Sequence, residues 1–185
     1  MIIVDDFLPD AKSVREVGLC AEFVDWPGPD GEVYKRIAIA EIPGLQDAIE
    51  RLLGPVEMLG MGYRLNFNGE LPNAAIHSDI GWGTHAAVLY LSEGEGGTAF
   101  WRHRATGAHR IDEGDMPLFE AVRHDWDDAS KWDQIALAEM KLGRCVIYES
   151  ALFHSRWPFA AFGTDADTGR LVGVSFFNIK GHGND

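Results

Sequence analysis

The sequence predicts a mainly β protein, an antiparallel sandwich or barrel with two flanking helices packed on its outside. From Met58 onward, short runs rich in β-branched and aromatic residues alternate with glycine-containing turns, which is typical of antiparallel all-β folds. Before Met58, two segments have apolar residues at helical spacing. At 185 residues with 46% hydrophobic content, the chain can bury one substantial core, so we expect a single domain over residues 1–185.

The N-terminal part is expected to hold one short strand, at residues 2–8, and the two helices. The first helix lies in "DAKSVREVGLCAEF", where Asp10 is placed to cap it and Val14 begins its apolar face. The second lies in "IPGLQDAIERLLGPV", which puts Leu45 and Ile49 on one side and stops at a Gly-Pro pair. The turn-rich "DWPGPDG" between them is expected to be a loop.

The remainder is expected to supply six further strands. They cover residues 58–68, 74–79, 85–92, 96–104, 143–150 and 170–180. Between the fourth and the fifth, residues from about 105 to 140 have mixed charge and are interpreted as an insertion with some helix.

Charge and composition argue against several classes of partner and indicate the compartment. The formal net charge of −13 argues against a nucleic-acid or anionic membrane partner. We expect no signal peptide, because the start "MIIVDDFLPD" has acidic residues where a basic segment and a long apolar run would be needed, and no apolar run reaches the roughly 20 residues of a membrane-spanning helix. Cys20 and Cys145 are far apart with no CxxC pair, which indicates reduced thiols and a cytoplasmic protein.

A histidine and an aspartate in "AAIHSD" suggest a metal site. In a strand, His77 and Asp79 point to the same face. The best third ligand is His154, which directly follows the strand-like "GRCVIYES" and so can turn back into the mouth of a barrel. Two histidines and one carboxylate form the facial triad that leaves three positions open on Fe(II). Zinc tolerates the same ligands, so the set favours iron without excluding zinc.

A fixed cation accompanies these ligands. Arg170 begins the last expected strand, at the end of a row of apolar residues on one face. There its guanidinium can bind a carboxylate through two parallel hydrogen bonds. Tyr90 on a neighbouring strand can hydrogen-bond the same carboxylate. Tyr63 and Asn66 alternate in "YRLNFN", so at most one faces the pocket, and Tyr63 is preferred.

In these features the sequence resembles the Fe(II)- and 2-oxoglutarate-dependent dioxygenases and, among them, members of the prolyl-hydroxylase-like branch. The order His77, Asp79, His154, Arg170 matches the family's ligands and carboxylate anchor. "VLYLSEGEGGTAF" is similar to the family's strand, double-glycine and strand segment, in which a tyrosine at the position of Tyr90 contacts 2-oxoglutarate. "VDDFLPDAKSVREV" and "GYRLNFNGELPNAAIHSD" are similar to its N-terminal strand and helix and to the strand before the metal motif. The resemblance covers residues 1–104 and 141–180.

The resemblance implies a double-stranded β-helix, a jelly-roll of the cupin-like kind, with the N-terminal helices outside. It implies catalytic metal ligands His77, Asp79 and His154 for Fe(II), with 2-oxoglutarate as cosubstrate, held by Arg170 and Tyr90, and O2 as oxidant. The expected activity is hydroxylation of a small molecule, or of an amino-acid side chain in a peptide or protein, with release of succinate and CO2.

Two other classes remain open at this point. The chain could be a non-catalytic β-barrel that binds or senses a ligand and retains a metal site, or a cupin-type metal enzyme that does not use 2-oxoglutarate. Cupins commonly use His-x-His followed by a glutamate, whereas this chain has His77-Ser78-Asp79, and Arg170 has no clear purpose in either class. The basic segment "WRHRATGAHR" either docks an anionic substrate group or forms a solvated hairpin, which we favour.

Overall fold

The structure is a computed structural model that describes residues 1–27, 33–70, 75–159 and 162–180. Its strands are β1 (Ile2–Val4), β2 (Val24–Pro27), β3 (Val33–Ile39), β4 (Val56–Asn66), β5 (His85–Tyr90), β6 (Gly97–His103), β7 (Trp132–Glu139), β8 (Cys145–Glu149), β9 (His154–Trp157) and β10 (Arg170–Ile179). Its helices are α1 (Ala11–Leu19), α2 (Leu45–Leu53), α3 (Met116–Val122) and the short 3-10 helix η1 (Ala129–Lys131). The mainly β prediction with flanking helices is confirmed.

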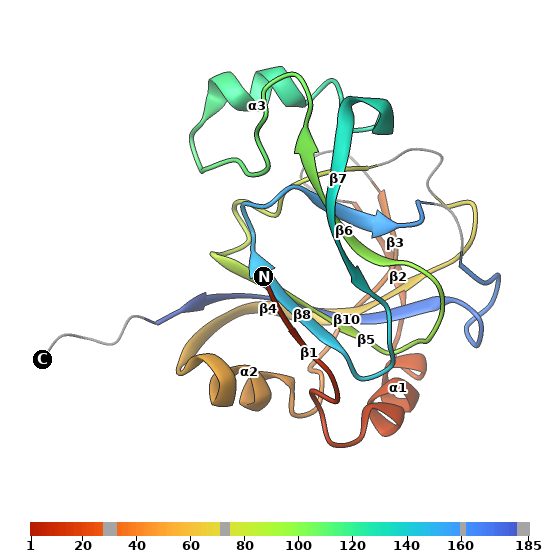
Figure 1. The fold of residues 1–185 in the computed structure, drawn as a ribbon. Coiled ribbons are helices and arrows are strands. Elements are labelled where there is room, and N and C mark those ends of the chain that lie inside the picture. The colour runs from red at the N-terminus through yellow and green to blue at the C-terminus, as the bar shows by residue number, and fades with distance from the viewer. Residues whose placement is uncertain (28–32, 71–74, 160–161, 181–185) are drawn as a thin grey trace, which may run out of the picture.

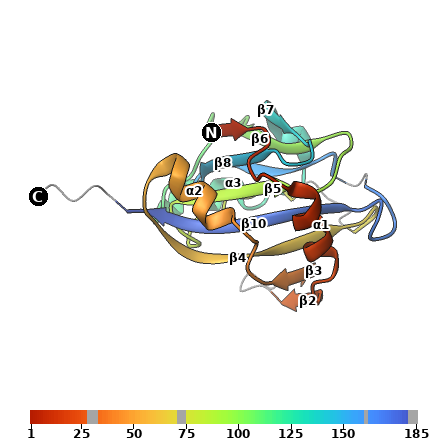
Figure 2. The same cartoon turned by 90° about the horizontal axis from the view of Figure 1, so that it is seen from below.

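Two antiparallel sheets face each other and enclose the inner core (Figure 1). The larger sheet has the order β1-β8-β5-β10-β4-β3-β2, and the smaller has the order β7-β6-β9. Helices α1 and α2 cover the outer face of the larger sheet, whereas α3 lies beyond the smaller one (Figures 1 and 2).

The two predicted N-terminal helices are confirmed, with the expected end signals. The carboxylate of Asp10 accepts a hydrogen bond of 3.0 Å from the backbone N–H of Ser13 and so caps α1. Helix α2 buries Leu45 and Ile49 against the sheet and ends at Gly54, whose φ of +83° suits glycine. No helix in the described ranges is long and apolar enough to cross a membrane.

Strand β5 contributes to two hydrophobic cores, one between the larger sheet and the helices and one between the two sheets. Both of its faces are buried, so "HAAVLY" is almost continuously apolar. Leu89 packs toward the helices, and Val88 and Tyr90 pack between the sheets. Burying each such apolar side chain contributes roughly 1.5–3 kcal/mol. The same alternation along β10 directs its even-numbered residues, Arg170 and Val172 first, into the space between the sheets.

A double glycine lets β6 approach its neighbours closely. A Cβ on Gly96, whose φ is +94°, would lie 2.0 Å from the carbonyl oxygen of Trp157. A Cβ on Gly97 would lie 1.9 Å from the carbonyl oxygen of Ala138. Side chains at these two positions would therefore separate β6 from the backbones on either side of it.

Five segments differ from expectation, and two of them, β3 and β9, are strands that the sequence did not predict. Residues 75–79 do not form the expected strand, because only His77 pairs, in an isolated bridge to His154; residue 74 lies outside the described residues. In the expected loop at 25–31, residues 25–27 belong to β2, and 28–31 lie outside the described residues. The segment 105–140 does contain α3 and η1, but its end is β7, which pairs along β6. A register shift in that pairing interrupts the two-residue period and explains why β7 was missed.

Candidate metal centre

Backbone pairing brings His77, Asp79 and His154 together between the two sheets. The N–H of His77 donates to the carbonyl of His154 at 3.0 Å, and the reverse bond is 2.8 Å. The N–H of Asp79 donates to the carbonyl of Ser150 at 2.8 Å. The segment carrying the first two side chains is therefore fixed against the chain that leads into β9.

The three side chains offer one ligand atom each, and these atoms all lie within 4.8 Å of one another. His77 Nε2 is 3.6 Å from Asp79 Oδ1, and His154 Nε2 is 3.2 Å from Asp79 Oδ2. The Nδ1 atoms lie 2.8 Å from the carbonyl of Ala75 and 2.9 Å from the carbonyl of Leu152, respectively. Each carbonyl holds the proton on Nδ1 and leaves the Nε2 lone pair free to face the cluster, as in metal-binding histidines.

The electrostatics of the cluster favour a cation. Burial by itself would raise the pKa of Asp79, but the charges of His154 and His77 bring that pKa below its usual value. Burial would lower the pKa of His154, but the Asp79 carboxylate raises it overall. The side chain of His154 is 7% exposed and that of His77 is 40% exposed, so the cluster is open on the His77 side.

Tyr148 was not singled out from the sequence, although it lies beside the cluster. Its ring centroid is 4.7 Å from that of His154 and 5.2 Å from that of Phe100. Burial, followed by the negative charge of Asp79, raises its pKa well above the usual value. A neutral phenol is therefore held next to the carboxylate that would bind a metal. The sequence did contain a signal for Tyr148. It lies two residues after Val146, and side chains two apart in a strand point to the same face, which here is the inner one.

Arg170 lies where the sequence predicted it, at the start of β10 and inside the barrel. It is 5% exposed, and its guanidinium donates a hydrogen bond of 3.1 Å to Asn66 Oδ1 on β4. Its carbon Cζ lies 5.6 Å from the ring centroids of both Tyr90 and Phe162. A cavity of about 240 Å³ reaches Arg170 between the turn at 93–95 and the loop before β10.

The two predicted tyrosines have different positions. Tyr90 faces the inner core beside Arg170, and its hydroxyl donates to the carbonyl of Ala138 at 2.9 Å and lies 2.8 Å from Thr98 Oγ1. Tyr63 was a wrong choice for the pocket, because it points to the opposite face of β4. There it is buried in the core under α1, where a Cβ on Gly18 would lie 2.8 Å from its ring. Asn66, the residue that was not preferred, lies on the inner face and contacts Arg170.

Two further arginines, not predicted from the sequence, lie inside the barrel with Arg170. Arg64 pairs in register with Val172, which belongs to the inner core, and Arg156 follows His154 by two residues on β9. Burial, then the charges of Arg156 and Arg170, lower the pKa of Arg64 to about 10. Burial, then the charge of Arg170, lowers the pKa of Arg156 to about 10. Three positive charges are thus close enough to disfavour one another.

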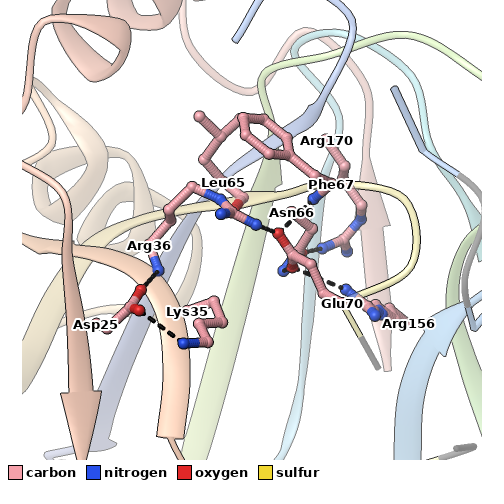
Figure 3. Close-up of polar contacts among 9 residues, drawn as sticks. All are labelled: Asp25, Lys35, Arg36, Leu65, Asn66, Phe67, Glu70, Arg156 and Arg170. Atoms are coloured by element: carbon pink, nitrogen blue, oxygen red, sulfur yellow. Dashed lines mark hydrogen bonds and ion pairs between the residues drawn. The ribbon is translucent and has the colours of Figure 1, made fainter. Parts of the chain in front are cut away.

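One carboxylate, that of Glu70, lies beside Arg156 (Figure 3). The side chain of Glu70 is 8% exposed, forms an ion pair with Arg36 and lies 3.5 Å from Arg156. It also accepts a hydrogen bond of 2.7 Å from the backbone N–H of Phe67. Glu70 is therefore fixed beside Arg156 by contacts on several sides.

The basic segment at 101–110 carries none of these inner charges. Arg104 lies 2.8 Å from the carboxylate of Asp133, and Arg110 lies 2.8 Å from Asp112 and 2.7 Å from Glu149. These arginines are exposed and neutralised by neighbouring acids, which agrees with the solvated hairpin that the sequence favoured.

Comparison with known proteins gives one match to a family and several to structures. The family model described as "Family of unknown function (DUF6445)" matches residues 74–177. Among curated proteins, none matches.

Solved structures share the fold over nearly the whole chain. The non-heme alpha-ketoglutarate-dependent epimerase SnoN from nogalamycin biosynthesis has a TM-score of 0.57 at 17% identity, with 95% of this chain and 77% of SnoN covered. The carbocyclase SnoK of the same biosynthesis has a TM-score of 0.53 at 15% identity, covering 92% and 72%. HygX from Streptomyces hygroscopicus, solved with nickel and 2-oxoglutarate bound, has a TM-score of 0.52 at 14% identity, covering 95% and 81%. These likenesses confirm the predicted double-stranded β-helix; the prolyl-hydroxylase-like branch stays a prediction.

Proposed function

Because this chain belongs to DUF6445, a family of unknown function, we propose its activity from the site itself: an Fe(II)- and 2-oxoglutarate-dependent oxygenase. The finer part of the proposal is hydroxylation of a small molecule or an amino-acid side chain, with release of succinate and CO2. The observation that carries it is the convergence of His77, Asp79 and His154 in a barrel that also buries Arg170.

The residues present fit a divalent metal. Two Nε2 atoms and one carboxylate converge, both histidines have their Nδ1 atoms held by backbone carbonyls, and one side of the cluster is open. His77, Asp79 and His154 would hold Fe(II), which leaves positions for further ligands. Bound Fe(II) would supply the oxidising chemistry that consumes O2 and 2-oxoglutarate and yields succinate, CO2 and the hydroxylated product.

Arg170 would bind the distal carboxylate of 2-oxoglutarate. A guanidinium that is almost fully buried can form two parallel charge-assisted hydrogen bonds to a carboxylate, which are stronger in a medium of low polarity. Asn66 holds one guanidinium nitrogen in place, and the ring of Tyr90 lies alongside. The Tyr90 hydroxyl, near Thr98 and Ala138, completes the polar end of the pocket.

Apolar side chains would separate the two ends of the cosubstrate from water. The rings of Phe100 and Tyr148 contact the ring of His154, and Val88 and Val172 belong to the same inner core. This surrounding would exclude water on the His154 side of the cluster and let the fixed charges act strongly there, while the His77 side stays open.

The test is anaerobic titration of 2-oxoglutarate into protein loaded with Ni(II), which occupies the metal ligands without turnover. We expect binding to wild type that requires metal, is lost in His77→Ala and weakens in Arg170→Met. Arg104→Met, which changes an exposed arginine of the hairpin, serves as the control and should bind normally. Absence of binding to folded, metal-loaded wild type would refute the proposal. Binding without succinate release under Fe(II) and O2 with any acceptor would favour a sensor over an enzyme.

A further inference from the structure

With a divalent metal bound, the positive charges inside the barrel outnumber the negative charges that the proposed function supplies. A divalent metal and Arg170 contribute three positive charges, and Asp79 and the two carboxylates of 2-oxoglutarate balance them. Arg64 and Arg156 are then left over inside the barrel, because Asp79 is already counted and Glu70, which lies beside Arg156, is already paired with Arg36. Buried charges are normally paired, so this excess calls for an additional anion.

Hydrogen-bond donors without a partner on these two arginines also favour an additional anion. Within the described residues, Nε, Nη1 and Nη2 of Arg156 have no hydrogen-bond partner, although the side chain is only 8% exposed. Nε of Arg64 is likewise buried without a partner. The chain has 29 acidic residues and pairs its hairpin arginines with them. Unused donors that persist inside the barrel are therefore suited to a ligand from outside.

The position of the two arginines relates them to the metal centre. Arg156 is two residues from His154 on β9, and the Cζ atoms of Arg156 and Arg170 lie 5.9 Å and 5.6 Å from the same Phe162 ring. Arg64 interacts electrostatically with both Asp79 and His77 as well as with the other two arginines. A molecule bound to this pair would reach the metal ligands without displacing Arg170.

We propose that Arg64 and Arg156 form a second anion site, which binds the carboxylate of a small organic acid, the substrate to be oxidised. This inference rests on the proposed function and narrows its substrate class to a free acid. Glu70 supports a carboxylate in particular, because the chain itself places a carboxylate 3.5 Å from Arg156 (Figure 3). That distance makes an ion pair without a hydrogen bond, so a ligand carboxylate can approach the same guanidinium more closely.

The experiment uses protein loaded with Ni(II) and 2-oxoglutarate, without oxygen, and a set of monocarboxylic acids each matched with its primary amide. Binding is measured by calorimetry for wild type, Arg64→Met and Arg156→Met, with Arg104→Met as the control. We expect at least one acid to bind wild type about tenfold or more tightly than its amide, and to lose about tenfold or more in both inner variants but not in the control.

A variant with the opposite expected effect sharpens the test. Glu70→Gln removes the competing negative charge, while its amide oxygen can still accept from the N–H of Phe67. It should therefore bind the same acid severalfold more tightly than wild type. Thermal unfolding of each variant checks that it is folded.

The outcomes separate this inference from the proposed function. 2-Oxoglutarate should bind the two inner variants with an affinity close to wild type and should bind Arg170→Met weakly. If 2-oxoglutarate binding is lost in the inner variants too, the arginines belong to the cosubstrate site and the second site is refuted. It is equally refuted if no acid binds better than its amide, or if inorganic phosphate binds more tightly than every acid. If wild type binds an acid but never 2-oxoglutarate, the proposed function fails and the anion site remains.

Discussion

Asn66 accepts a hydrogen bond of 3.1 Å from Arg170 across the paired strands β4 and β10, where the two residues are direct partners in register. The bond holds a buried guanidinium at one end of the barrel, so that its remaining donors can meet a carboxylate without reorganising. Asn66 is then a positioning residue for the proposed 2-oxoglutarate site.

Replacing Asn66 with leucine should weaken 2-oxoglutarate binding. Loss of a hydrogen bond to a charged group costs about 1.5–3 kcal/mol, which corresponds to roughly 10- to 150-fold in affinity. The measurement is anaerobic titration of the Ni(II)-loaded protein, with Tyr63→Phe as the matched control on the other face of β4. An unchanged affinity in Asn66→Leu would show that Arg170 needs no support from β4.

Tyr63→Phe should leave 2-oxoglutarate binding intact and leave stability unchanged or slightly higher. The Tyr63 hydroxyl is buried with no hydrogen-bond partner among the described residues, so its removal relieves a desolvated polar group. We expect a gain of up to about 1 kcal/mol in the free energy of unfolding. Denaturant unfolding measures it, and a loss exceeding 1 kcal/mol would mean that the hydroxyl has a partner, such as a buried water.

The contrast between Tyr63 and Asn66 shows what sequence reasoning could reach. Alternation indicated correctly that only one of them faces the pocket, but the choice depends on the register of β4 against β10, which a sequence does not contain. Arg170 could be predicted because it begins a strand with clear alternation. Arg156 could have been found in the same way, since it follows His154 by two residues, but the strand β9 is short and was not recognised.

The metal cluster was easier to anticipate than the strand that carries part of it. His77 and Asp79 were expected to share a face of a regular strand, whereas His77 makes a single bridge to His154 and Asp79 bonds to Ser150. Hydrogen bonds to residues far along the chain therefore give the convergence that a regular strand would also have given. Partners such as Tyr148 come from distant strands, so their proximity to Asp79 follows only from the assembled sheets.

Arg156→Met should stabilise the protein in the absence of any ligand. The substitution replaces a nearly buried cation, disfavoured by the charges of Arg64 and Arg170, with an apolar side chain of similar length, while Glu70 keeps its ion pair with Arg36. We expect about 1 kcal/mol, or an increase of roughly 2–4 °C in Tm. Differential scanning calorimetry makes the comparison, and Arg104→Met on the surface should change Tm little. A Tm that falls by several degrees would show that Arg156 is satisfied within the native protein.

Tyr148→Phe should weaken metal binding while preserving the fold. The phenol lies beside Asp79 and the ring of His154, and loss of a polar group that orients metal ligands typically costs 10- to 100-fold in affinity. We expect a decrease of about tenfold in Ni(II) affinity, measured by competition with a chromophoric chelator. Tyr63→Phe is again the control, and equal affinities in the two variants would remove Tyr148 from the metal centre.

The two cysteines should differ sharply in reactivity, which probes the packing of β8 under the helices. Cys145 is fully buried, and burial raises the pKa of its thiol to about 12, whereas Cys20 is exposed at the end of α1. Because the thiolate is the reactive form, a neutral-pH thiol reagent should modify one cysteine per native chain and two in denaturant. Cys20→Ser should therefore abolish native labelling at pH 8. Rapid labelling of that variant without denaturant would mean that β8 opens often enough to expose Cys145, and that the larger sheet is far less rigid than its packing indicates.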